Sequence, residues 1–144
     1  FHASEQRREA IAAHLRAHGA EAVGGFTRDA TIAGIDHARA RVDADGIAAA
    51  DVVLVPLEDG DRAAALAAAG KQEIVIDLNP LSRSMEAATV PIADNVTRAM
   101  PAIASAAADL RDAQRAEREA LLAGFDAAAA RAAAEEALRE ATLS

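Results

Sequence analysis

The chain has 144 residues, a length that suits one domain, and 52% of them are hydrophobic but only three are aromatic, which predicts a thin core packed through alanine. A net charge of −8 argues against a basic surface that binds nucleic acid, and the lack of cysteine excludes disulfides, thiolate zinc sites and a cysteine nucleophile. No apolar run is long enough to cross a bilayer, so we expect a soluble, cytoplasmic protein with no membrane partner.

The N-terminal third begins with a predicted helix and then loses a clear pattern. Ser4 is a good N-cap and Gly19 a good stop for a helix that ends near His18. Residues 21–25 are expected to form a short strand closed by glycines. Residues 26–45 have no firm period, so we expect a loop with one helical turn.

The middle of the chain carries the strongest signal, two strand-length segments at 51–56 and 73–77 whose central residues are all apolar. Continuous apolarity is typical of strands that are covered on both faces. Between the runs, residues 62–69 are predicted to be helical, with Gly70 at the end. A strand, a helix and a strand in this order predict a parallel βαβ unit.

Further elements follow the second strand. We expect a helical turn at 84–88, a third strand at 89–93 and a helix opened by Asp94, which Pro101 either kinks or ends by starting another helix. Residues 102–142 are rich in helix formers and are predicted to be a helical hairpin, broken once by Gly124, that packs on the sheet or on another subunit.

These elements together predict an α/β fold, a Rossmann-like parallel sheet with flanking helices and a C-terminal helical extension. We expect an α/β nucleotide-binding domain over residues 1–101 and a helical tail over residues 102–144. Because the chain begins with Phe1 and not with Met, we expect residues 1–101 to be the C-terminal portion of a longer domain.

Candidate ligand-binding residues lie in the loops that follow the three strands, because ligands of open parallel sheets bind beyond the carboxyl ends of the strands. In the loop after 73–77, Asn79 can donate and accept, Arg83 can bind phosphate through two N–H groups, and Ser84 offers a hydroxyl. The same residue types also form turns and caps, so the sequence leaves a binding and a purely structural interpretation open.

Other chemistries have weak signals or none. Glu58, Asp59 and Asp61, or Asp77 with Asp94, could hold a divalent metal, but carboxylates in such places are more often caps and turns. The histidines show no metal-ligand spacing and are expected at the surface; they are His2, His14, His18 and His37. We therefore predict no protein metal centre. The sequence has no Walker loop, no Gly-x-Gly-x-x-Gly motif and no serine-hydrolase elbow.

Three stretches resemble the archaeal 4-phosphopantoate–β-alanine ligase family, also called phosphopantothenate synthetase. They are residues 55–62 (VPLEDGDR), 76–83 (IDLNPLSR) and 93–101 (ADNVTRAMP). The resemblance covers about residues 1–104, and the three stretches together are much more specific than any one of them. The acidic, lysine-poor composition resembles a halophilic member of the family.

The resemblance implies an enzyme of coenzyme A biosynthesis. Family members condense 4-phosphopantoate with β-alanine at the expense of ATP, through an acyl-adenylate, and release AMP and diphosphate; the implied cofactors are ATP as a substrate and Mg²⁺, and the implied assembly is a homodimer. By matching positions, the ATP contacts fall on Asp77, Leu78, Asn79, Arg83, Ser84, Asn95 and Val96. A candidate substrate or phosphate loop comprises Glu58, Asp59, Asp61 and Arg62.

Catalysis in such an enzyme is expected to come from alignment and charge stabilisation, because no residue stands out as a covalent nucleophile. Family members have about 100 more residues at the N-terminus, where further ATP-contacting arginines are expected. A second hypothesis is therefore a non-catalytic nucleotide-binding or oligomerisation module, with the α/β part as the ligand site and the tail as a partner surface.

Overall fold

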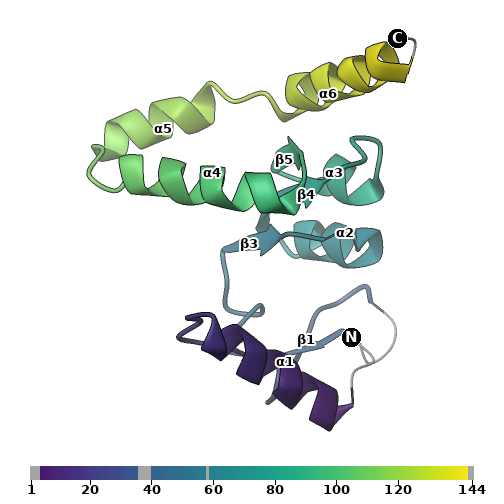
Figure 1. Ribbon diagram of the computed structural model, residues 1–144, viewed down its shortest axis with the longest axis vertical. Coiled ribbons are helices and arrows are strands. Elements are labelled where there is room, and N and C mark those ends of the chain that lie inside the picture. The colour runs from purple at the N-terminus through teal and green to yellow at the C-terminus, as the bar shows by residue number, and fades with distance from the viewer. Residues whose placement is uncertain (1–3, 36–39, 58, 143–144) are drawn as a thin grey trace.

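The computed structural model describes residues 4–35, 40–57 and 59–142 (Figure 1). In chain order, the elements are α1 (Glu5–Ala17), β1 (Ala30–Thr31), β2 (Arg41–Val42), β3 (Val52–Val55), α2 (Gly60–Ala68), β4 (Gln72–Asp77), α3 (Arg83–Ala87), β5 (Val90–Ala93), α4 (Val96–Asp109), α5 (Arg115–Ala123) and α6 (Ala127–Thr142). None of the helices in these ranges is both long and apolar enough to cross a membrane.

The centre of the fold is a three-stranded parallel sheet in the order β3–β4–β5. Val55 of β3 is in register with Val75 of β4, and Asp77 of β4 is in register with Ala93 of β5. The carboxyl ends of the three strands therefore lie along one edge of the sheet, as the two apolar runs and the third short strand predict. This confirms the mixed α/β class and the parallel βαβ unit.

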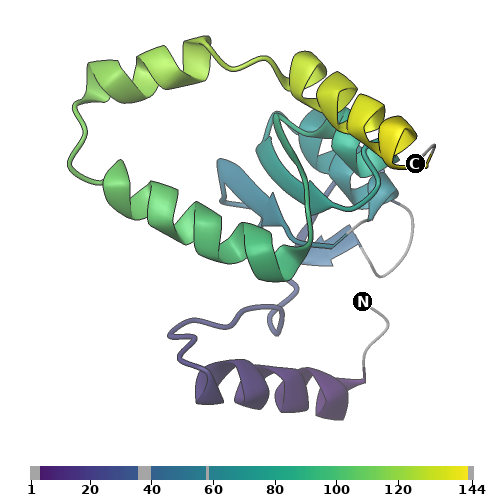
Figure 2. The same ribbon diagram turned by 45° about the horizontal axis from the view of Figure 1, so that its top comes forward.

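Helices pack on the sheet and lie beyond its two outer strands. The helices α2 and α3 pack on each other and on β4, α4 contacts β4, and α6 contacts β5. Figures 1 and 2 show α1 with the β1–β2 hairpin beyond β3, and α6 at the opposite end of the molecule beyond β5. The α4–α5 pair extends away from the sheet as an arm, so the tail contacts the domain mainly through α6 and the start of α4.

Two small apolar clusters form the core. Val75, Met85 and Ala88 pack with Val55 between the sheet and α3. A second cluster joins the N-terminal part to α2 and consists of Ile32, Val42, Ala65 and Leu66, with partly buried neighbours around it. Alanine supplies several fully buried positions, which confirms the expectation of a thin core.

The predicted strand at 21–25 is wrong, and the 26–45 segment contains the short β1–β2 pair. Ala40, just before β2, is in a 3₁₀ turn, and the preceding residues 36–39 lie outside the described residues. The carboxylate of Asp43 explains why no strand forms. It accepts hydrogen bonds from the backbone N–H groups of Gly25, Phe26 and Arg28, so these donors go to a side chain and not to a neighbouring strand. Gly25 has φ +97°, in the left-handed region that favours glycine.

Strand β3 is not covered on both faces, contrary to the prediction. Val52 is 55% exposed and Leu54 is 37% exposed, while Val53 and Val55 on the other face contact the core clusters. In the described sheet β3 is an edge strand that pairs with β4 alone, and its face that carries Val52 and Leu54 is left open. A continuous apolar run therefore does not distinguish an edge strand from a central one.

The helix boundaries after β4 also differ from the prediction. The helix α3 begins at Arg83 with Ser82 as its N-cap, and α4 begins at Val96 with Asn95 as its N-cap. Pro101 lies inside α4 and starts no new helix. Its missing N–H removes a single intrahelical hydrogen bond, the one to the Thr97 carbonyl, and the helix continues to its end.

The tail is broken twice, not once. In addition to the break at Gly124, α4 ends at Asp109 and α5 begins after Gln114. The N–H of Gln114 donates to Glu117 (3.0 Å), which is one half of a capping box. This local signal outweighs the helix-forming composition of the segment.

Candidate nucleotide-binding site

The candidate site is built from the loops that follow β3, β4 and β5. Because the strands are parallel and in register, the turns after Ile76 and Ala93 lie next to each other at the same edge of the sheet. The loop after β3 joins them there, since Asp61 in the first turn of α2 pairs with Arg83 at the start of α3 (2.8 Å). The structure thus brings together the three motifs that carry the family resemblance.

The loop after β4 is held by its own polar side chains. Oδ1 of Asp77 accepts a hydrogen bond from the N–H of Asn79 (3.0 Å), and Oδ1 of Asn79 accepts one from the N–H of Leu81 (3.0 Å). Two consecutive turns of this kind fix the backbone and leave the side chain of Leu78 exposed. The amide nitrogen of Asn79 remains available to donate to a ligand.

One carboxylate oxygen of Asp77 lacks a hydrogen-bond donor among the described residues. Its Oδ2 is buried and has no hydrogen-bond partner among the described residues. A buried carboxylate oxygen without a donor is unfavourable, and such groups in native structures need an explanation. A donor brought by a ligand at this edge of the sheet would supply the missing hydrogen bond.

Ser84 is placed differently from the other residues that the resemblance assigns to ATP. Its side chain is fully buried, and its Oγ accepts a hydrogen bond from the N–H of Asp59 (3.3 Å). Ser84 therefore joins the loop after β4 to the loop after β3. The exposed group at the start of α3 is Arg83, whose guanidinium bonds to Asp61.

The loop after β3 serves mainly to start α2. Asp59 caps this helix by accepting a hydrogen bond from the N–H of Arg62 (3.3 Å), and Asp61 pairs with Arg83. Glu58, the third carboxylate of this loop, lies outside the described residues. Within the described ranges, no group of three or more histidine, cysteine, aspartate or glutamate side chains could hold a metal ion.

The loop after β5 ends in a well-capped helix. Asn95 accepts hydrogen bonds from the N–H (2.9 Å) and the hydroxyl (2.7 Å) of Thr97, and Asp94 pairs with Arg98. The Arg98 guanidinium, followed by the N–H of Asn95, holds the pKa of Asp94 below its usual range. The N–H of Thr97 donates to the side chain of Asn95 and that of Arg98 to the Asn95 carbonyl, so among the first N–H groups of α4 that of Val96 is left to donate at the positive end of the helix dipole.

The arrangement combines the groups that a nucleotide requires. Asp77 and Asn79 can bind hydroxyl or base edges, Arg83 can neutralise phosphate charge, and the start of α4 offers an N–H donor to an anion. Oδ1 of Asp94 already accepts from Arg98 and from the N–H of Asn95, and Asp94 belongs to no group of three possible metal ligands among the described residues. The proposed pair of Asp77 and Asp94 thus finds no support in the geometry.

Sequence reasoning missed a second region that is rich in functional groups. A cavity of about 550 Å³ lies between α1, the segment 23–28, β2 and the first turn of α2. Arg62 is the member of the predicted sets that lines it. Arg8, Arg28 and Arg41 also line it, and no local sequence pattern indicates that these three residues converge.

The fold and the loops at the carboxyl edge of the sheet define a Rossmann-like α/β domain with a helical extension. The profile of the family described as phosphopantothenate/pantothenate synthetase matches residues 1–141. The chain belongs to this family.

Similar curated proteins are archaeal and are named 4-phosphopantoate–β-alanine ligase. The one from Thermococcus onnurineus is 44% identical over 127 residues, which cover 88% of this chain and 49% of the relative. The one from Methanospirillum hungatei is 51% identical over 104 residues, which cover 72% of this chain and 42% of the relative. The chain spans about half the length of the curated relatives it matches.

Proposed function

We propose that the three loops bind ATP, with Asp77, Leu78 and Asn79 at the nucleoside and Arg83, Asn95 and Val96 at the phosphates. The observation that carries this proposal is the buried Oδ2 of Asp77, which lacks a donor at the edge where parallel sheets bind ligands. A ribose hydroxyl is a donor of suitable size for this position. Ser84 does not contact ATP in this proposal; its hydroxyl holds the loop after β4 to the loop after β3 through the N–H of Asp59.

The reaction that we propose is the condensation of 4-phosphopantoate with β-alanine. The acid carboxylate attacks the α-phosphorus of ATP and diphosphate leaves; the amine of β-alanine then attacks the acyl carbon, AMP leaves and 4′-phosphopantothenate forms. Family membership and the names of the relatives support this activity. The enzyme would work in the cytoplasm, in coenzyme A biosynthesis.

The chain's own residues contribute binding and charge stabilisation. Arg83 is exposed at the edge and pairs with an equally accessible carboxylate, Asp61, so a polyphosphate can compete for its guanidinium. The N–H of Val96 at the start of α4 would stabilise negative charge without the need to reorganise. Together they favour the departure of diphosphate, which carries away most of the charge.

We expect Mg²⁺ to enter this site bound to the phosphate oxygens of ATP. The described residues offer no cluster of three ligands, and magnesium commonly keeps several waters and binds through phosphate oxygens. The metal would supply charge neutralisation on the phosphates. The chain would contribute few ligands to it.

The test uses the protein expressed from its complete coding sequence. We expect AMP to form from ATP, 4-phosphopantoate and β-alanine, and its formation to require β-alanine. Arg83→Ala should lower kcat/KM for ATP by about 100-fold, since one charge-assisted contact to phosphate is worth roughly 3 kcal/mol. The matched control is Arg16→Ala, which removes an exposed arginine of α1. A folded wild-type enzyme without β-alanine-dependent AMP, or an Arg83→Ala enzyme with normal ATP use, contradicts the proposal.

The tail supports a second proposal, that two copies of the protein associate through it. Large apolar side chains are exposed on α5 and α6 and in the connection between them: Leu121, Leu122, Phe125 and Leu138. Several large apolar groups exposed on successive helices are typical of a protein–protein contact. Sedimentation should show a dimer that Leu122→Glu dissociates, and a monomeric wild-type protein contradicts it.

The alternative of a non-catalytic module makes a different prediction for the same protein. It requires ATP binding, measured by calorimetry, together with no AMP formation in the presence of both other substrates. The family membership favours the ligase.

A further inference from the structure

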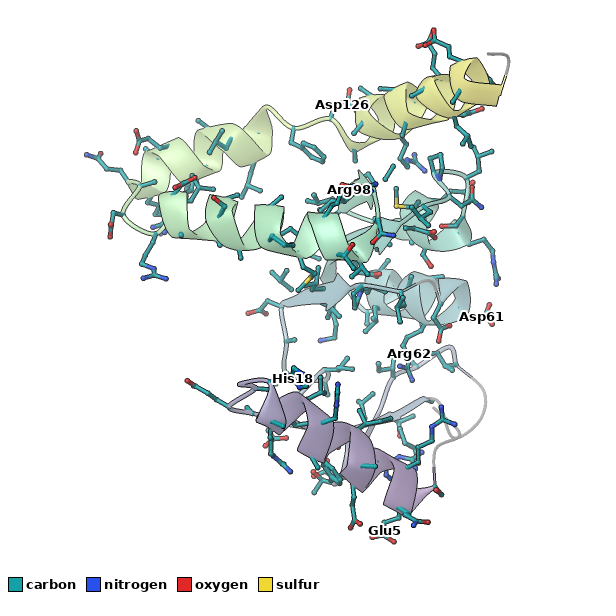
Figure 3. All side chains as sticks on the ribbon, viewed as in Figure 1. Glu5, His18, Asp61, Arg62, Arg98 and Asp126 are labelled. Carbon is teal, nitrogen blue, oxygen red and sulfur yellow. The ribbon has the colours of Figure 1, made fainter. Side chains whose placement is uncertain are left out.

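Two histidines at the end of α1 are in direct contact. The ring centroids of His14 and His18 are 4.4 Å apart, and the ring planes are tilted by 42°. Both residues are exposed, so a solute can reach them. Figure 3 shows His18 at the end of α1 opposite to Glu5. The spacing of four residues places both side chains on one face of the helix, and the structure adds that the two rings meet there.

A hydrogen bond holds the ring of His18 in place. Its Nδ1 is 2.9 Å from the carbonyl oxygen of His14. A carbonyl oxygen can only accept, so Nδ1 carries the hydrogen, and the lone pair of the neutral ring is on Nε2. Histidines that bind metals almost always donate their other ring N–H to a carbonyl, a carboxylate or a water. The backbone of α1 thus prepares Nε2 of His18 to act as a metal ligand.

The separation of the two rings suits one shared cation. An imidazole nitrogen lies about 2.0 Å from a first-row divalent metal, which places the centroid of its ring about 3 Å from the metal. Two such rings that subtend an angle of about 90–110° at the metal have centroids roughly 4–5 Å apart. The 4.4 Å between His14 and His18 falls in this range, so chelation requires no change in the helix.

The end of α1 also favours a cation electrostatically. The last carbonyl groups of a helix carry the negative end of its dipole, and His14 lies in the last turn with His18 at the C-cap. Arg16, the other basic residue of this turn, is two positions from each histidine and is therefore directed about 200° away around the helix axis. The local field thus agrees with the ligand geometry.

We propose that His14 and His18 together bind one divalent transition-metal ion of the kind that prefers imidazole nitrogen, such as Zn²⁺ or Ni²⁺. Water completes the coordination, since the described residues hold no group of three or more metal-binding side chains. The site differs in chemistry from Mg²⁺ on ATP phosphates, which prefers oxygen, and it does not rest on the proposed function. A bound ion links the last turn of α1 to its C-cap and stabilises this end of the helix.

Calorimetry with Zn²⁺, and separately with Ni²⁺, tests the proposal on untagged protein from the complete coding sequence. His14→Gln and His18→Gln should each weaken binding at least about 10-fold, because even an outer-shell partner of a metal ligand contributes that much. Mg²⁺ should not displace either ion. Zn²⁺ should raise the melting temperature of the wild type by more than that of either variant.

A spacing control separates chelation from the mere number of histidines. The double variant Ala13→His, His14→Gln has as many histidines as the wild type, but the two on α1 are five residues apart and point about 140° away from each other. It should bind Zn²⁺ no better than His14→Gln. All these positions are exposed, so the melting temperatures without metal should match that of the wild type.

Two results would overturn the proposal. One is a wild-type protein that binds neither Zn²⁺ nor Ni²⁺. The other is binding by both single variants, or by the double variant, that equals binding by the wild type. In either case the contact between His14 and His18 is a packing of two rings and not a metal site.

Discussion

Glu73 makes the stability of this protein depend on pH in an unusual direction. Its side chain is 0% exposed, at the amino end of β4, and neither carboxylate oxygen has a hydrogen-bond partner among the described residues. Burial in this environment raises the pKa of Glu73 from 4.5 to about 7. The folded protein therefore binds a proton at this position that the unfolded chain has already released.

The sign and the size of the effect follow from this difference in pKa. Below pH 4.5 the group is protonated in both states, and its burial carries no charge penalty. As the pH rises from 4.5 through 7, Glu73 ionises in the unfolded chain but stays protonated in the folded protein. Ionisation stabilises the unfolded state, so the free energy of unfolding falls. At about 1.4 kcal/mol for each pH unit, the loss reaches at most about 3 kcal/mol by pH 8.

Urea denaturation at pH 5 and pH 8 measures this loss. Glu73→Gln has nearly the same shape but no proton to lose, so the variant should gain up to about 3 kcal/mol relative to the wild type on going from pH 5 to pH 8. The control, Glu9→Gln, changes an exposed glutamate of α1 and should follow the wild type at both pH values. Wild-type and Glu73→Gln curves that stay parallel from pH 5 to pH 8 would refute a buried carboxyl with a raised pKa.

Two further variants test how the N-terminal part is held to the sheet. Lys71→Met removes an ammonium that donates to the carbonyls of Ala48 (2.8 Å) and Ala50 (2.7 Å). The variant should lower the free energy of unfolding, measured in urea, by about 2 kcal/mol. An unchanged midpoint contradicts the role of these hydrogen bonds. Asp43→Asn should lower the melting temperature at neutral pH, because the variant lacks the ionised carboxylate. The wild type should lose the same contribution to stability as the pH falls below the usual aspartate range. If acid denaturation is the same in both proteins, the backbone donors do not stabilise the Asp43 anion.

The regular part of the fold could be read from the sequence because its signals are local. The apolar runs of β3 and β4, the cap Ser4 and the glycine after α2 each act within a few residues. Gly70 has φ +78°, as a helix-ending glycine requires. The parallel direction of β3 and β4 followed from the rule that a short βαβ unit is parallel.

The segment 20–45 could not be read because its partners are distant in sequence. Asp43 organises backbone groups that precede it by 15–18 residues, and no periodic pattern records such a contact. The four arginines of the cavity come from α1, the loop before β1, β2 and α2, so their convergence is a property of the tertiary fold alone. The break before α5 is different, since Gln114 and Glu117 already had the spacing of a capping box.

The adjacency of the polar turns was predictable from the sequence, but the exposure of the individual side chains in them was not. Adjacent polar turns at one edge follow from parallel strands, and the structure confirms that the turns after Ile76 and Ala93 are neighbours. Ser84 and Arg83 are consecutive, yet one is fully buried and the other exposed, because a helix directs successive side chains about 100° apart. Sequence alone gave no means of deciding which of the two faces a ligand.

The two ends of β4 show how position decides what a buried carboxylate does. Glu73 and Asp77 both keep oxygens without a hydrogen-bond donor among the described residues. Glu73 is at the amino end, closed in by the core, where protonation is the available means of lowering the cost of burial. Asp77 is at the carboxyl end, half-buried beside two helix starts, where a ligand can approach and donate. The same unsatisfied group is therefore expected to make stability depend on pH at one end of the strand, and we propose that it binds a ligand at the other.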